Sequence, residues 1–178
     1  MPTLERMREW HRVMMQGLDA EDPTYVGRFR GTPGFPALAE HVEIAGILGT
    51  PHADVDAEAL AFEARVQAVV ATLNAMYPSP ATLDDDGREA VIELAAHAHG
   101  EWVRIHSFIN GNGRAARIWA NLIMQRYGML PVLATRPRPA ERAYADAASA
   151  CMNGDFAPLA ACIRKAYDAV VGAAKPGK

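Results

Sequence analysis

The stretch Ile105-His106-Ser107-Phe108-Ile109-Asn110-Gly111-Asn112-Gly113-Arg114-Ala115-Ala116-Arg117 lies between two apolar helical patterns and decides how the rest of the chain is arranged. It predicts a helix, a loop and a second helix that opens at the glycines. Free N–H groups and the positive end of the second helix dipole would point into the loop and favour an anion there. Arg114 and Arg117, three residues apart, would add positive charge, and His106 would stand at the opposite lip.

Length and charge predict one domain that binds neither nucleic acid nor a membrane. The 178 residues are enough for a single core over about 4–171, with a flexible tail over 172–178. A net charge of −3 gives no general attraction to nucleic acid, and no apolar run approaches the roughly 18 residues of a membrane span. Free cysteines and the lack of a signal-like start favour the cytoplasm, with a secreted effector as the alternative.

Apolar spacing along the chain predicts an all-α bundle of about six to eight helices. The residues 42–51, with β-branched side chains around a glycine and a closing proline, indicate a small β-hairpin, although a plain connection between two helices fits them too. His11 and His99 fall on helices where packed histidines are expected, and His99 could support the loop from two turns before His106. The expected helices cover about 4–18, 54–76, 84–105, 115–127, 139–152 and 157–171.

Residues 106–117 resemble the signature of the Fic (Fido) family, His-Pro-Phe-x-Asp/Glu-Gly-Asn-Gly-Arg-x-x-Arg. The chain matches every specified position except those of Ser107 and Asn110. Gly27-Arg28-Phe29-Arg30 resembles the element that follows the family's first core helix, and residues 42–51 fall where its substrate-docking flap lies. Residues 144–155 resemble the region that borders the nucleotide base. The resemblance therefore extends over nearly the whole chain and implies the Fic fold.

The activity implied by this resemblance is transfer of AMP from ATP to a Tyr, Ser or Thr hydroxyl of a target protein. His106 would be the general base. The phosphates would be held by backbone N–H groups, by the Asn112 amide and by both motif arginines, while the flap would align the target by strand addition. The implied catalytic residues are His106, Asn112 and Arg114; the nucleotide-binding residues are Gly111, Asn112, Gly113, Arg114, Arg117 and Tyr144; the flap residues are Glu43, Ile44, Ala45, Gly46, Ile47 and Leu48.

Two departures from the signature bear on the loop and on the metal. Ser107 replaces a proline and would loosen the loop entrance slightly. Asn110 replaces the carboxylate that ligates Mg²⁺ in the family, and an amide oxygen lacks its charge. The hypothesis is that Mg²⁺ is held more weakly, mainly through the nucleotide phosphates.

Several alternatives remain open from the sequence. The donor could be another phosphate compound such as UTP or CDP-choline, and Asn110 also fits a nucleotide-binding protein with weak or lost turnover. Gly113 argues against the Doc-type kinases, which carry lysine there. The family's inhibitory Ser/Thr-x-x-x-Glu pattern is not found. The chain is therefore expected to be inhibited by a small antitoxin-like partner that supplies a glutamate to Arg117, to be a piece of a longer protein, or to be unrestrained. The last alternative is a purely structural glycine loop whose arginines pair with the acidic residues 84–86.

Overall fold

The computed structural model describes all residues except 19, 45, 136, 138 and 175–178. Six α-helices, one two-stranded hairpin and several single 3-10 turns make up the described chain. The all-α class with one small hairpin is thus confirmed. The main elements are α1 (Leu4–Met15), β1 (Glu43–Ile44), β2 (Ile47–Leu48), α2 (Val55–Met76), α3 (Asp85–Ile105), α4 (Asn112–Arg126), α5 (Arg142–Ala150) and α6 (Ala157–Ala174).

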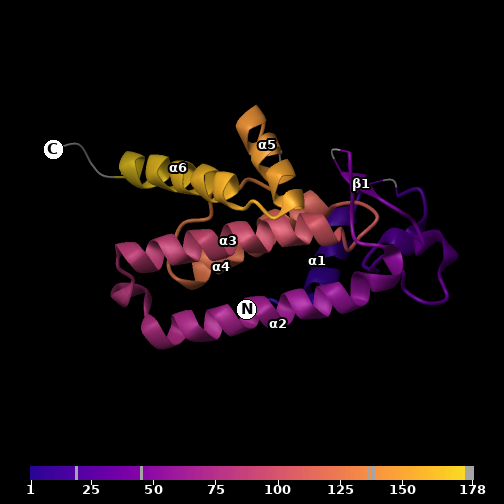
Figure 1. Ribbon diagram of the computed structural model, residues 1–178, viewed down its shortest axis with the longest axis horizontal. Helices are drawn as coiled ribbons and strands as arrows, with labels where there is room; N and C mark the ends of the chain where they lie inside the picture. The colour runs from indigo at the N-terminus through magenta and orange to yellow at the C-terminus, as the bar shows by residue number, and fades with distance from the viewer. Residues whose placement is uncertain (19, 45, 136, 138, 175–178) are drawn as a thin grey trace.

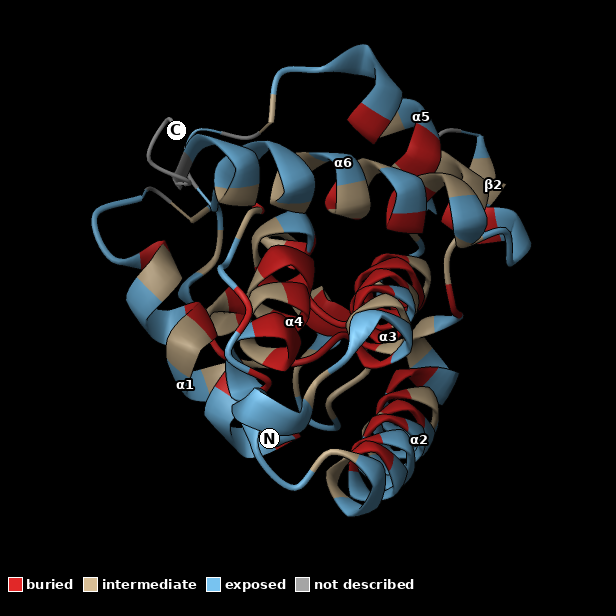
Figure 2. Cartoon of the chain, turned by 90° about the vertical axis from the view of Figure 1, so that its left-hand side faces the viewer, coloured by how far each residue is buried: buried red, intermediate tan, exposed pale blue. Residues whose placement is uncertain are grey.

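Helix α3 is the central element around which the others are placed. It packs against α2, α4 and α6, and Figure 1 shows it running between α2 and α6. Viewed from the end of the molecule, many residues of α3 and α4 are buried (Figure 2). None of the described helices is long and apolar enough to cross a membrane.

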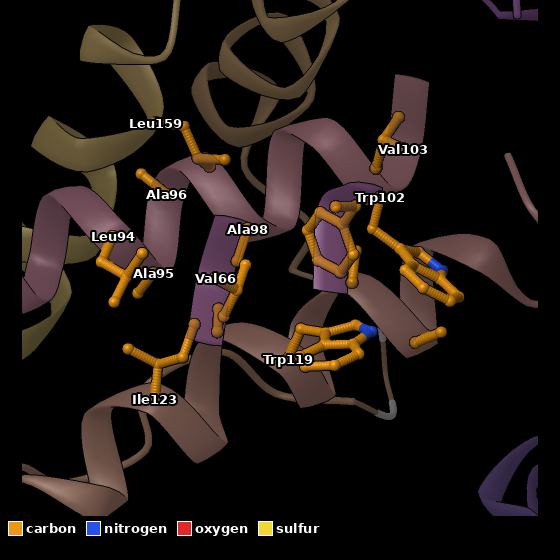
Figure 3. Packing of buried hydrophobic residues seen from close by; sticks show 14 of the residues in the cluster. Val66, Leu94, Ala95, Ala96, Ala98, Trp102, Val103, Trp119, Ile123 and Leu159 are labelled. Atoms are coloured by element: carbon orange, nitrogen blue, oxygen red, sulfur yellow. The ribbon is translucent and has the colours of Figure 1, made fainter. Parts of the chain in front are cut away.

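Large aromatic side chains fill the core where α2, α3 and α4 meet. Phe62, Trp102 and Trp119 are fully buried, and the Phe62 ring centroid lies 5.6 Å and 5.1 Å from those of the two indoles (Figure 3). Burying one such side chain stabilises a fold by about 1.5–3 kcal/mol. This cluster fixes the axis of α3 against α4, and so the two helix ends that flank the loop.

Local sequence explains both ends of α3. Its first turn is capped by the Asp84 carboxylate, which accepts a hydrogen bond from the Gly87 N–H at 2.8 Å. Its C-cap is His106, in the left-handed conformation.

At Gly100 the helix α3 approaches the turn after α5 so closely that a Cβ there would lie 2.6 Å from Cys151 Cβ. The glycine therefore lets the turn after α5 sit directly on α3.

Several helix ends differ from the sequence-based expectation. Helix α4 begins three residues earlier than expected, at Asn112, because Gly111 takes a positive φ of 75° as its N-cap. Asp54 precedes α2 as expected, but its side chain makes no capping hydrogen bond and a 3-10 turn leads directly into the helix. Helix α6 reaches Ala174, so the first residues of the expected tail are helical, while 175–178 lie outside the described residues.

The hairpin predicted over 42–51 is present and lies beside the end of α3. Its strands pair antiparallel, with Glu43 opposite Leu48 and Ile44 opposite Ile47. Thr50, just after the hairpin, donates its N–H to the Arg104 carbonyl at 3.3 Å, which ties the hairpin to the last turn of α3 (Figure 1). Ala45, one of the expected flap residues, lies outside the described residues.

Candidate functional site

His106 stands at the end of α3 in an unusual backbone conformation. Its φ of 53° makes it the one non-glycine residue with positive φ in the described chain. Such a conformation persists where surrounding contacts over-determine it. Its N–H donates to the Trp102 carbonyl at 3.0 Å, and its own carbonyl accepts from Arg30 Nε at 2.7 Å. The His106 backbone is therefore held from both sides.

The Arg30 side chain is the main anchor of this end of the loop. It is fully buried and donates to four backbone carbonyls at distances of 2.7–3.0 Å, which come from residues 40, 50, 105 and 106. Its own N–H donates to the Ser107 carbonyl at 2.8 Å. The loop entrance is thus tied down through the Ser107 carbonyl, a group that a proline would also offer. The effect of the missing proline stays a prediction.

The His106 ring is arranged as a neutral base. Its Nδ1 lies 3.3 Å from the Val103 carbonyl, an acceptor, so Nδ1 carries the proton and Nε2 keeps its lone pair. Burial lowers the pKa of His106 to about 4; the Val103 bond opposes this shift, and the charge of Arg30 adds to it. The imidazole is therefore unprotonated, and able to accept a proton, throughout the physiological pH range.

Asn112 closes the loop on itself. Its Oδ1 accepts from the Phe108 N–H at 3.0 Å, and its Nδ2 donates to the Phe108 carbonyl at 2.7 Å. The side chain is 2% exposed. Both polar atoms of the amide bond to the protein backbone, so Asn112 holds the shape of the loop. The phosphate-binding role that the resemblance implies for this amide stays a prediction.

His11, on α1, supports the loop through hydrogen bonds and ring stacking. Its Nδ1 accepts the Gly27 N–H at 2.9 Å, so its Nε2 carries the proton and donates to the Asn110 carbonyl at 3.1 Å. Its ring stacks on Phe108 at 3.8 Å between centroids, and burial lowers its pKa to about 4. His11 is a packed histidine, as expected, yet its support of the loop depends on contacts 99 residues apart that no local sequence signal shows.

The N-terminus of α4 opens into the loop. The Gly111 carbonyl accepts from the N–H groups of Arg114 and Ala115, as the first turn of the helix requires. Within the described residues, the N–H groups of Asn112 and Gly113 have no backbone acceptor. A Cβ at Gly111 would lie 3.1 Å from His11 Nε2, so glycine is needed there for space as well as for its φ. The open helix N-terminus expected here is thus present, and anion binding at it stays a prediction.

The two motif arginines go to different partners, although their spacing suggested one face. Arg114 Nη1 donates to the Met14 carbonyl at the end of α1 at 3.0 Å, and its Nη2 lies 3.4 Å from Met15 Sδ. Arg117 is 5% exposed, and its Nη1 would lie 3.4 Å from a Cβ at Gly113. Arg117 therefore lies directly against the loop, while the described bonds of Arg114 tie the loop to α1.

Tyr144 occupies a different place from the one expected. It was assigned to the border of the adenine, but it is 5% exposed and packs in the core. Its hydroxyl lies 2.7 Å from His99 Nε2 and 3.5 Å from Arg117 Nη1. Because its ring is covered, this side chain contacts the site through Arg117, and the structure offers no open face of Tyr144 to a base.

An oxygen ligand for Mg²⁺ is available at Asn110. Its Oδ1 is buried and has no hydrogen-bond partner among the described residues. No cluster of three or more His, Cys, Asp or Glu side chains in the described chain could hold a metal. The described residues therefore offer Mg²⁺ one neutral oxygen ligand. Bound phosphates and water would supply the others.

The purely structural interpretation, in which the loop arginines pair with the acidic residues 84–86, does not hold. Residues 84–86 lie at the opposite end of α3, which at about 1.5 Å per residue is roughly 30 Å away. Asp85 pairs with Arg88 within the first turn of that helix. Among the described residues, no carboxylate lies within ion-pair distance of Arg117.

Comparisons with known proteins agree with this geometry. A sequence model described as the Fic/DOC family matches residues 2–124. The chain is 37% identical over 91 residues to a protein adenylyltransferase fic-1 of Caenorhabditis briggsae and 35% identical over 81 residues to a protein adenylyltransferase Fic of Drosophila persimilis. These matches cover 50% and 43% of this chain, but only 18% and 16% of the relatives.

The solved structures show the same fold over almost the whole chain. A fragment of Fic-1 from Caenorhabditis elegans superposes with a TM-score of 0.65 at 26% identity, covering 96% of this chain and 42% of that one. A variant of the same fragment gives a TM-score of 0.59. The chain thus corresponds to less than half of the solved fragment.

Proposed function

The chain belongs to the Fic/DOC family, and from that membership and the geometry of its loop we propose that it transfers AMP from ATP to a hydroxyl group of a target protein. The observation that carries the proposal is the loop itself. A neutral histidine stands on one side of it, with the open N-terminus of α4 and the buried, unneutralised Arg117 on the other. The relatives named as protein adenylyltransferases support the same activity.

The proposed reaction is an in-line displacement at the α-phosphorus. The target hydroxyl oxygen attacks, its proton passes to His106 Nε2, and the bond from the α-phosphorus to the bridging oxygen breaks, so that pyrophosphate leaves. The proton on Nδ1 stays bonded to the Val103 carbonyl and keeps the ring in the tautomer that accepts.

The phosphates would lie at the N-terminus of α4. The N–H groups of Asn112 and Gly113 would donate to them, and Gly111 would let the chain approach them closely. Arg117 would neutralise charge on the leaving pyrophosphate. Mg²⁺, held by Asn110 Oδ1 and the phosphates, would screen the phosphate charges further.

The hairpin would present the target. It is tied to α3 at Arg104, two residues before His106, and Leu48 on β2 is 72% exposed. A two-stranded hairpin leaves backbone N–H and C=O groups free at its outer edges, and an extended target segment can pair with such an edge. This pairing would fix the position of the hydroxyl without demanding a particular sequence.

Arg117 is also the proposed point of inhibition. Since no described carboxylate pairs with it, a glutamate from a small antitoxin-like partner would find an unneutralised guanidinium beside the phosphate site. Such a partner would compete with ATP for Arg117 and would raise the apparent KM for ATP.

The test is transfer of label from α-³²P-ATP to proteins of a cell extract, or to the chain itself. We expect labelled product with Mg²⁺, and loss of at least about 100-fold in rate in His106→Ala, the effect usual for removing a general base. His97→Ala, which alters another histidine of α3 whose ring packs on Phe156, is the matched control and should keep full activity.

Parallel reactions decide between donors. Transfer from γ-³²P-ATP would indicate a kinase, and labelling only from UTP or CDP-choline would replace ATP by that donor. ATP binding without transfer from any donor would indicate a nucleotide-binding protein with lost turnover. Undiminished transfer in His106→Ala would refute the assigned base.

A further inference from the structure

Three buried side chains from three different helices meet behind the loop. His99 on α3, Arg117 on α4 and Tyr144 on α5 are 1%, 5% and 5% exposed. The Tyr144 hydroxyl lies 2.7 Å from His99 Nε2 and accepts from Arg117 Nη1 at 3.5 Å. Arg117 Nη2 donates to the Thr135 carbonyl at 3.2 Å. The Arg117 guanidinium is thus held by groups from α5 and from the segment between α4 and α5.

Among the described residues, the printed hydrogen bonds of this network involve no carboxylate. The direction of the hydrogen bonds is consistent if Arg117 donates to the Tyr144 oxygen and Tyr144 donates to His99 Nε2. His99 is then neutral, and burial followed by the charge of Arg117 keeps it so by lowering its pKa to about 3. Donation to His99 makes the Tyr144 oxygen a better acceptor for Arg117, because linked hydrogen bonds polarise one another.

Two nitrogen atoms of the network remain without partners. Arg117 Nε and His99 Nδ1 are buried, and neither has a hydrogen-bond partner among the described residues. The half-buried Arg104 is treated differently, because it pairs with Glu58 and Glu101. A carboxylate at Arg117 would hold the side chain more strongly, but it would also neutralise the charge that a phosphate needs.

We propose that Tyr144, anchored by His99, is a positioning residue that holds Arg117 against the loop for phosphate binding without neutralising its charge. This inference rests on the proposed use of Arg117 as a phosphate ligand. It gives Tyr144 a function through its hydroxyl, and it gives His99 a function that its helix position alone did not show. Neither residue touches the substrate.

The experiment compares Tyr144→Phe with Tyr127→Phe. Tyr127 is a matched control, because it is 4% exposed and its hydroxyl bonds to Val70 and Asn74, away from the loop. Arginine side-chain NMR reports the position and mobility of Arg117 in the absence of any ligand. We expect the Arg117 guanidinium signals to shift and broaden in Tyr144→Phe, and to stay as in the wild type in Tyr127→Phe.

Binding of ATP and AMP to the same variants gives the functional reading. Loss of one hydrogen bond that orients Arg117 should weaken ATP binding about fivefold in Tyr144→Phe. AMP lacks the phosphates that Arg117 would hold, so its affinity should not change. His99→Leu should also weaken ATP binding, and by no more than Tyr144→Phe does. A purely structural role would weaken both nucleotides equally, and that result would overturn the proposal.

A double mutant tests whether Tyr144 acts through Arg117. In an Arg117→Met background, Tyr144→Phe should have no further effect on ATP affinity. An additive fivefold loss would contradict the proposal. If the wild type binds no ATP, the NMR comparison still decides: shifted Arg117 signals would support the positioning role while the proposed function fails, and unchanged signals would overturn the positioning role as well.

Discussion

Two buried arginines lie on opposite sides of the same loop and differ in how their donors are used. Arg30 donates to four carbonyls at 2.7–3.0 Å. Arg117 makes longer bonds, of 3.2 Å and 3.5 Å, and its Nε has no partner among the described residues. A guanidinium has five N–H donors, so Arg30 is nearly saturated and Arg117 is not. One arginine maintains the loop, and the other has donors left over, which the proposed function assigns to phosphate.

The same difference extends along the loop. On the Arg30 side, His11 uses both ring nitrogens for hydrogen bonds, and Asn112 uses both of its amide atoms. On the Arg117 side, Asn110 Oδ1 and the first N–H groups of α4 lack protein partners in the part of the chain that is described. Buried polar groups without partners destabilise a fold by about 1–3 kcal/mol each. Ser107 Oγ at the Arg30 end also lacks a partner, but the proposed function uses the groups at Asn110, at Arg117 and at the start of α4, and we call this the ligand side.

The largest expected effect is the loss of stability in Arg30→Met. This change leaves four carbonyls without their donor, and we expect unfolding free energy to fall by about 4 kcal/mol or more. In Arg117→Met the change should be under about 1 kcal/mol, because its bonds are long and an unneutralised buried charge is removed. Urea unfolding of both variants measures the difference. Equal losses of unfolding free energy in the two variants would show that the two arginines do not differ in this way.

Protons should destabilise the saturated side of the loop. Unfolded His11 binds a proton near pH 6.5, whereas in the folded chain its pKa is lowered to about 4, so acid favours unfolding between these values. His11 alone should remove up to roughly 3 kcal/mol of stability as the pH falls from 6.5 to 4. Its protonation would also break the bond from the Gly27 N–H to Nδ1.

Urea unfolding at several pH values between 7 and 4 tests this expectation. His11→Phe should be less stable at pH 7, where it lacks both hydrogen bonds, but its stability should depend less steeply on pH. His41→Phe, at an exposed position, is the control and should keep the steep dependence of the wild type. A slope that His11→Phe leaves unchanged would show that His11 does not carry the effect.

The sequence determined the helices well, because their apolar periodicity and the Asp84 cap are local features. It also located the loop, whose glycines and arginines are adjacent in the chain. The start of α4 was missed because glycine and asparagine are poor helix formers, whereas Gly111 serves here as a cap in the left-handed region.

The support of the loop could not be predicted in the same way. Arg30 reaches the His106 carbonyl across 76 positions, and His11 reaches Asn110 across 99. The Gly27-Arg28-Phe29-Arg30 element was noticed only through a resemblance, which carries no geometry. Tyr144 was likewise assigned to a base, because the sequence does not tell which face of α5 is covered. Such contacts are set by tertiary packing and leave no local pattern.

The smallest expected effect concerns Asn110, on the ligand side. Asn110→Asp puts a charged oxygen where the partnerless amide oxygen lies, and Mg²⁺ prefers charged oxygen ligands. If the ligand side is built for phosphates and their metal, the Mg²⁺ concentration for half-maximal AMP transfer should fall about fivefold, equivalent to roughly 1 kcal/mol. Asn153→Asp adds the same charge at an exposed position and should leave the Mg²⁺ requirement unchanged. Activity independent of Mg²⁺, or a requirement that Asn110→Asp does not lower, would remove Asn110 from the metal site and leave the unneutralised Arg117 as the chief mark of the ligand side.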